Sequence, residues 1–266
     1  MKKADLPAWA LPTFQSCIAQ LCDIRRVLTA STSGLTAVAE SPRLRQDLAG
    51  FGSKVETRVR SYAKNIWPQG ENSKVDLRRD FQLLRASAIV ALWGALEVAI
   101  EDFLIAWMLN NPSALRIEAL QKTKIALAEY EVLDREDRMR VLFRELERSV
   151  IGKQGVDCFE PMLQIFGLSG PVEAEPKKAI NELQHVRNVM VHRGGRADRR
   201  FVEACHDWKA RVGEPLKLSG KHCSQYRRAV AEYVLTVAER VATRLGVTAS
   251  LELDRLRSSR RTAVTR

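Results

Sequence analysis

The feature that most constrains the fold of this chain is the apolar stretch Ala86–Leu109. It is long enough to cross a bilayer as a helix, but Glu97, Glu101 and Asp102 lie inside it. Charged side chains at that depth of a membrane are costly. We therefore expect a buried central helix of a soluble protein, with no contact with a membrane.

The helical pattern of this stretch begins before its most apolar part. Ser73, followed three residues later by Asp76, is typical of a helix start, and the pattern then continues to Leu109. Such a helix is longer than most in globular proteins, so we expect a kink near Ser87 or Gly94.

Helical periodicity also dominates the rest of the sequence, and no alternating pattern is long enough to build a sheet. We expect a first helix over about residues 13–29, ended by the Ser-Thr-Ser-Gly run at 31–34, because such runs favour loops. Further helical patterns cover about 43–67, with a bend at 50–54, then 113–150, 176–193 and 226–245, and a looser stretch covers 152–172. The sequence thus predicts an all-α fold.

Composition narrows the range of partners and compartments. The 266 residues include 43 Lys and Arg against 32 Asp and Glu, and the net charge of +11 favours polyanionic partners. Five cysteines without C-x-x-C spacing argue against a disulfide framework or a zinc ribbon. Asp5, Pro7 and Pro12 interrupt what would be the apolar core of a signal peptide. A reducing cytoplasm is the expected compartment, and no metal or cofactor is expected.

The most informative helix runs from about Pro176 to Arg193. Its end carries Arg187, Asn188 and His192, which we call the Arg-Asn-His motif. At about 100° per residue, Asn188 and His192 share one face, whereas Arg187 falls in the middle of the apolar arc. A buried guanidinium keeps its proton and needs an acceptor. Alternatively, the Arg187 stem packs while its head reaches water, and His192 interacts with the helix dipole.

Two acidic residues of the central helix are candidate partners for that guanidinium. Glu97 and Glu101 lie one turn apart, a like-charge spacing that costs about 0.2–0.5 kcal/mol unless a cation intervenes. Arg187 is our candidate for this cation. The alternative is that both glutamates mark a solvated face.

A basic segment follows the motif. Arg193, Arg196, Arg199 and Arg200 bring the number of arginines between 187 and 200 to five. Such a cluster favours docking of backbone phosphates without sequence preference, although it is also compatible with ordinary surface charge. The adjacent residues Cys205-His206 and His222-Cys223 make poor zinc ligands, because neighbours in a chain point in different directions.

The spacing Arg187-Asn188-x-x-x-His192 near the end of a helix resembles the signature of HEPN domains. These are all-α dimers that include many metal-independent ribonucleases of bacterial toxin and antiphage systems. The segment from Arg193 to Phe201 is also similar to members of that superfamily. The resemblance covers about residues 77–245 and implies an antiparallel helical bundle, with an N-terminal helical extension over 1–76 and a basic tail over 246–266.

The resemblance also implies a reaction and an oligomeric state. Arg187, Asn188 and His192 would be catalytic, the arginines at 193, 196, 199 and 200 would bind RNA, and Glu97 and Glu101 would support them. Because Arg187 and His192 point about 140° apart on one helix, two chains would form a composite site in a homodimer. Cleavage would leave a 2′,3′-cyclic phosphate. A HEPN-like module that binds RNA or a nucleotide, or acts as an antitoxin or scaffold, and a structural helical dimer stay open as alternatives.

Control of such an activity is a separate question. In one subset of HEPN toxins, a tyrosine two residues after the histidine is modified by a partner enzyme. This chain has Gly194 at that position, so that route is not expected here. An antitoxin or another defence-system protein is a candidate partner.

Overall fold

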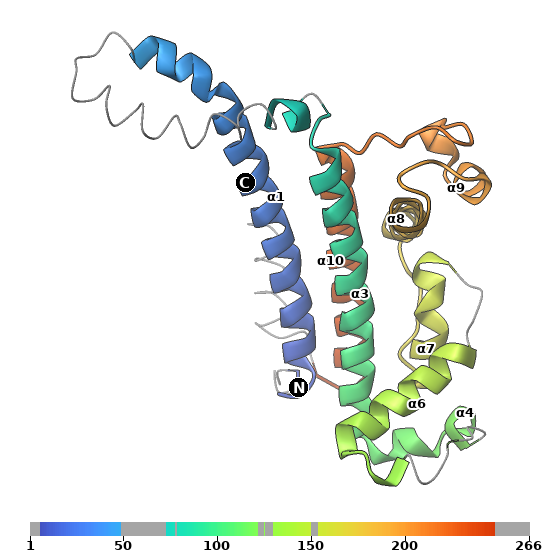
Figure 1. The fold of residues 1–266 in the computed structure, drawn as a ribbon. Helices are drawn as coiled ribbons and strands as arrows, with labels where there is room; N and C mark the ends of the chain where they lie inside the picture. Colours follow the sequence, from blue (N-terminus) through green and yellow to red (C-terminus); the bar gives the residue numbers. More distant parts are fainter. Residues whose placement is uncertain are drawn as a thin grey trace.

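The computed structural model describes residues 6–48, 73–77, 79–121, 125, 130–149 and 154–247, and within these ranges the chain is all-α, as predicted (Figure 1). The elements are α1 (Leu11–Leu48), α3 (Gln82–Asn110), η1 (Pro112–Arg116), α4 (Glu118–Gln121), α6 (Arg135–Ser149), η2 (Gly155–Cys158), α7 (Glu160–Ile165), α8 (Ala174–His192), α9 (Arg199–Ala204), η3 (His206–Trp208) and α10 (Gly220–Arg244). The predicted helix over 43–67 beyond Leu48, its bend and the C-terminal tail lie outside the described residues.

Helix α3 is the centre of the core, as its apolar sequence predicts. It contacts α1, α6, α8 and α10, and Leu96, Phe103 and Leu104 are fully buried. Complete burial of such side chains contributes roughly 1.5–3 kcal/mol each. Of the helices described, α3 alone has the length and composition of a membrane-spanning segment. Here its apolar side chains pack against the neighbouring helices.

The bundle is only partly antiparallel. Phe14 packs on Phe103 with ring centroids 5.0 Å apart, and Cys17 lies beside Ala95, so α1 runs antiparallel to α3. Helices α3 and α10, however, begin side by side, because the Gln82 amide exchanges two hydrogen bonds with the backbone of Leu218. The two helices therefore run in the same direction, so the antiparallel arrangement that the resemblance implied holds for α1 and α3 but not for α3 and α10. The long segment 111–219 returns the chain to the starting end (Figure 1).

Helix α1 continues through the run of residues that was expected to end it. Thr32 and Thr36 donate their hydroxyl protons to the carbonyls of Leu28 and Thr32, which satisfies both side chains without breaking the helix. Gly34 lies inside α1, with open space where a Cβ would be. The contacts of α1 with α3 outweigh the weak local preference for a loop.

The start of the central helix also differs from the prediction. Residues 73–77 are helical, but residues 79–81 form a turn before α3 begins at Gln82. Asp80 and Phe81 have φ angles of 51° and 53° in this turn. The side chain of Phe81 is buried, and Arg85 bonds both Asp80 and the Leu218 carbonyl. The break therefore precedes α3, and Ser87 and Gly94 both lie within the continuous helix.

Candidate functional site

The site is built on α8, whose bounds agree closely with the sequence prediction. Ile180, Leu183 and Val186 on its apolar arc are fully buried and hold the helix against α3 and α10. The helix ends at His192, where the Gly195 N–H donates to the Val189 carbonyl at 3.1 Å. In Figure 1, α8 is seen nearly end-on, so it crosses α3 and α10 and does not run along them.

Arg187 is held half-buried at the inner side of α8. Its Nη1 donates to Oδ1 of Asn188 at 3.0 Å. Its Nε is buried and has no hydrogen-bond partner among the residues that the structure describes. A buried N–H group without an acceptor costs about 1–3 kcal/mol. The guanidinium is thus oriented by its neighbour and still has an unused donor.

The positive charge of this guanidinium acts on Glu97 of α3. Surrounding protein displaces water from the carboxylate, which raises its pKa above the ordinary value. The Trp93 indole N–H and the positive charge of Arg187 oppose that shift, whereas Glu147 and Glu101 reinforce it. Arg187 is therefore a cation close enough to Glu97 to stabilise its charged form.

Glu101 forms its ion pair with Arg140 and not with Arg187. Arg140 of α6 lies 3.4 Å from Glu101 and 3.5 Å from Asp102, and its other terminal nitrogen bonds Glu136 at 2.8 Å. The idea that Arg187 separates Glu97 from Glu101 is thus wrong for Glu101. Pairing with an arginine 39 residues away depends on how α6 packs against α3, which the local pattern does not reveal.

A group of hydrogen bonds beside the motif, which we call the polar clamp, was not predicted from the sequence. Gln184 accepts a hydrogen bond from the Gly155 N–H at 2.6 Å and donates to Sγ of Cys158 at 3.6 Å. His185 bonds the Gln154 side chain at 2.9 Å. Gly155 has φ of 59°, and a Cβ there would approach the Asn181 Cα to 2.8 Å. These contacts fix the segment 154–158 against α8. The glycine in an otherwise loose stretch was the only sequence signal.

His192 shares a helix face with Asn188 but not with Arg187. It is the last residue of α8 and is exposed, and it has no hydrogen bond with any residue in the described ranges. Asn188 is one turn earlier on the same face, whereas Arg187 points about 140° away. One chain therefore brings Arg187, Asn188 and Glu97 together and leaves the His192 imidazole free in solvent.

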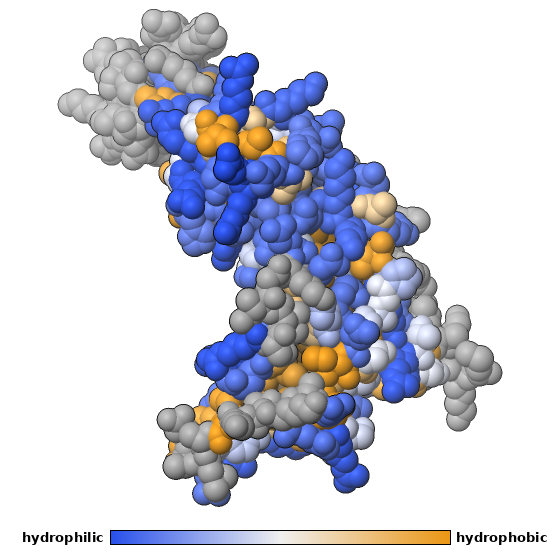
Figure 2. Space-filling model, turned by 90° about the vertical axis from the view of Figure 1, so that its right-hand side faces the viewer, coloured by the Kyte–Doolittle hydropathy of each residue, from blue (hydrophilic) through white to orange (hydrophobic). Residues whose placement is uncertain are grey.

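The basic segment after α8 is exposed, as a phosphate-docking surface requires. Arg193 lies 3.4 Å from Asp198, Arg196 donates to the Gly213 carbonyl, and Arg199 lies 3.8 Å from Glu203. All of these arginines, together with Arg200, keep solvent-accessible side chains. Figure 2 shows that the side of the molecule with α8, α9 and α6 is predominantly hydrophilic.

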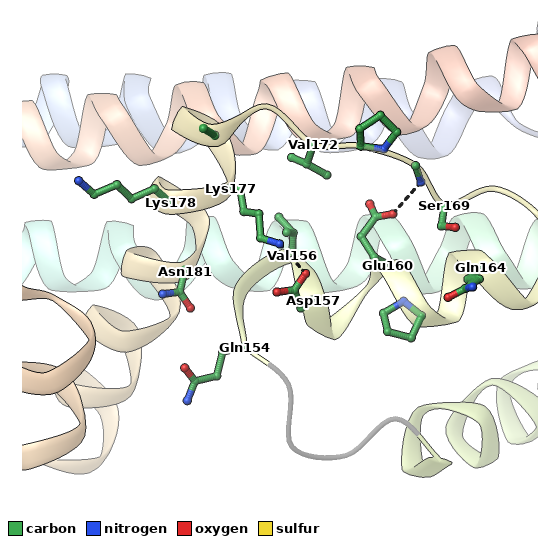
Figure 3. Close-up of a pocket in the computed structure, with 14 residues that line it drawn as sticks. Gln154, Val156, Asp157, Glu160, Gln164, Ser169, Val172, Lys177, Lys178 and Asn181 are labelled. Atoms are coloured by element: carbon green, nitrogen blue, oxygen red, sulfur yellow. Dashed lines mark hydrogen bonds and ion pairs between the residues drawn. The ribbon is translucent and has the colours of Figure 1, made fainter.

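A cavity lies at the opposite end of α8. It has a volume of about 1200 Å³ and is lined by polar and apolar residues of η2, α7, the 169–172 loop and the first turns of α8 (Figure 3). Its charges are already paired: Lys177 lies 3.0 Å from Asp157, and Glu160 bonds Arg240 at 2.8 Å. Lys177 and His192 are separated by about 22 Å along the helix axis. The cavity is therefore separate from the Arg-Asn-His motif.

The adjacent pairs Cys205-His206 and His222-Cys223 do not form a metal-binding cluster. Cys205 and Cys223 are buried in the core, and His222 accepts the Ser219 N–H at 3.1 Å in the capping box of α10. Within the described ranges, no group of three His, Cys, Asp or Glu side chains is placed to hold a metal.

Comparisons of the chain with protein-family models, curated proteins and solved structures gave no match.

Proposed function

We propose that the protein is a metal-independent endoribonuclease of the HEPN type, acting in the cytoplasm as a toxin or antiphage effector. The observation that carries this proposal is the end of α8, where an exposed His192 lies one turn beyond the Arg187–Asn188 pair and just before the exposed arginines. The motif also resembles the HEPN signature.

The chemistry follows from the residues present. The ribose 2′-oxygen forms a bond to phosphorus as the bond to the 5′-oxygen breaks, which leaves a 2′,3′-cyclic phosphate and a 5′-hydroxyl. An imidazole has a pKa suited to removing the 2′-proton or protonating the departing oxygen. The Arg187 guanidinium stabilises the added charge on the phosphoryl oxygens. Asn188 and Glu97 position Arg187, and Arg193, Arg196, Arg199 and Arg200 hold the RNA backbone.

A homodimer resolves the separation of Arg187 from His192. Helix α3, although central to the core, also has an apolar stripe of Leu83, Val90 and Val98, which are 76%, 37% and 46% exposed. Gly94 lies on the same stripe with open space above it. Glu97, the neighbour of Arg187, is adjacent to Val98 in sequence. Dimerisation through this stripe would bring the Arg187 sites of two chains toward a shared cleft.

The decisive experiment is incubation of the purified protein with total RNA in EDTA, with product ends analysed for cyclic phosphate. We expect cleavage by the parent and a loss of about 10²–10⁴-fold in the His192→Ala variant. His206→Ala is the matched control, because His206 is exposed in η3 and lies outside the motif.

Several outcomes would decide against a nuclease. If His192→Ala cleaves as fast as His206→Ala, the observed cleavage comes from another group or a contaminant. If the parent binds RNA in low salt but never cleaves it, the binding-module alternative is favoured. Absence of both binding and cleavage would leave only a structural role for the motif.

A further inference from the structure

Arg227 of α10 is a largely buried arginine with no counterion among the described residues. Its exposure is only 7%, and it has no hydrogen bond or ion pair with any of the described residues. A charged group removed from water is costly unless an opposite charge or acceptor compensates it. Loss of water and the nearby charges of Arg25 and Arg228 lower the pKa of Arg227 below its ordinary value. Without a bound anion, the surroundings of Arg227 therefore disfavour its positive charge.

Arg227 lines a cavity enclosed by α1, α3 and α10. The cavity has a volume of about 250 Å³, far more than one water molecule needs. Arg25 and Arg85 line the same space, so that three helices each contribute a guanidinium. The Arg85 charge is already compensated by Asp80, and its Nη1 also donates to the Leu218 carbonyl. We call this space the arginine cavity.

The first turns of α10 complete the wall. Gly220, Ser224 and Arg227 are spaced by four and three residues, so they share one face of the helix, and all three line the cavity. Ser219 caps the helix by accepting the His222 N–H. The first-turn N–H groups and the positive end of the helix dipole favour an anion at this end. The cavity wall also includes the hydroxyl-bearing residues Thr29 and Thr32 of α1.

We propose that the arginine cavity binds the phosphate group of a small phosphorylated ligand. Guanidinium groups match the oxygens of phosphate with paired N–H donors, and a helix N-terminus adds further donors. The small volume accommodates a phosphate group but not a nucleic-acid strand. The remaining walls include Ile24, Leu28, Ala88 and Leu92, which suits a ligand whose other part is small and apolar. This site is independent of the RNA cleavage proposed above.

The test is a titration of the purified full-length protein with inorganic phosphate, followed by thermal unfolding. At about five times its dissociation constant, phosphate is expected to raise the melting temperature by about 2–4 °C, whereas sodium chloride at equal ionic strength does not. A parallel titration with butyl phosphate, whose other part is small and apolar, distinguishes a monoester from the free ion. Tighter binding of the monoester identifies the ligand class, and binding of neither anion overturns the proposal.

Two arginine variants separate a ligand site from a structural role. Arg227→Met keeps a long apolar stem while removing the charge, so we expect it to abolish the phosphate-dependent shift. Without phosphate it should be at least as stable as the parent, since a buried unpaired cation has been removed. Arg228→Met, at the exposed neighbouring position of α10, should retain the full shift.

Each contrary result is informative. If Arg227→Met retains the phosphate effect, the ion binds elsewhere and the proposal is wrong. If Arg227→Met is strongly destabilised in the absence of phosphate, then Arg227 is a structural residue with an internal counterpart. The His192→Ala variant should show the parental phosphate shift, so failure of the nuclease proposal and failure of this one can be told apart.

Discussion

At the scale of single residues, the most informative group is the Arg187 guanidinium. Its Nη1 is bonded to Asn188 and its Nε is buried without a partner. Burial of this unpaired N–H therefore costs the folded protein free energy. Such an unpaired buried donor is uncommon in folded proteins, and under the proposed function a phosphate oxygen of the RNA supplies its acceptor.

Arg187→Lys tests whether the planar guanidinium matters. Lysine keeps the charge beside Glu97 but lacks the two-donor geometry, so we expect RNA cleavage to fall by about 10²–10³-fold. The melting temperature should change little, because a buried N–H without an acceptor is removed along with the bond to Asn188. Parallel measurements of cleavage and thermal unfolding check this. Cleavage at the parental rate would show that charge alone is sufficient, contrary to the proposed role.

His185 predicts a dependence of stability on pH. It is buried, and loss of water lowers its pKa below the ordinary value of 6.5, although Asp198 partly opposes the shift. The unfolded chain therefore binds a proton more readily than the folded chain. The free energy of unfolding should decrease as the pH falls through about 6.5 and reach its full value above about pH 7.5.

Substitution of His185 measures how much of the pH dependence of the free energy of unfolding comes from this histidine. Burial also lowers the pKa of His222, so His185→Gln should reduce the slope of stability against pH without abolishing it. His206→Gln is the control, because that side chain is exposed. Urea unfolding at a series of pH values gives the slopes. An unchanged slope in His185→Gln would assign the effect to other groups.

At the scale of the helices, the sequence was informative where the signals were local. The bounds of α8 could be predicted because its apolar arc and its closing glycines lie within the segment itself. The end of α1 and the break before α3 could not, because packing against α3 and burial of Phe81 decide them. The Arg140 partner of Glu101 and the hydrogen bonds of Gln184 could not be predicted either, because both depend on how distant segments pack together.

Gly34 offers a test of the helical continuity of α1. It is an exposed glycine within the helix, and an added Cβ would meet nothing within 4 Å. We expect Gly34→Ala to stabilise the protein by about 0.5–1 kcal/mol. Gly155→Ala is the opposite case, because its φ of 59° and the approach to Asn181 at 2.8 Å should make it destabilising. Urea denaturation of both variants measures the difference. Destabilisation by Gly34→Ala would argue against a continuous α1.

At the scale of the whole molecule, the apolar stripe of α3 is the candidate dimer surface. Val90→Glu and Val98→Glu introduce charges on this stripe without entering the core. We expect these variants to be monomeric at concentrations where the parent is dimeric, and to lose cleavage with dimerisation. Sedimentation velocity and RNA cleavage are the measurements. Val212→Glu, at an exposed valine of the 209–215 loop, is the matched control.

A mixing experiment tests the composite site. His192→Ala and Arg187→Lys should each cleave at least about 10²-fold more slowly than the parent, but a mixed dimer would keep one intact histidine and one intact arginine. If two chains share one cleft, mixing restores part of the cleavage activity. If activity stays absent in a mixture shown to contain heterodimers, each chain must form its own site.

The parallel pairing of α3 with α10 has a consequence for timing during translation. The ribosome completes α8 before it begins α10, yet α8 is seated in the folded protein against both α3 and α10. A nascent chain therefore lacks part of the packing that supports α8 until α10 has emerged from the ribosome. Under the proposed function, a chain at that stage of synthesis would not yet cleave RNA.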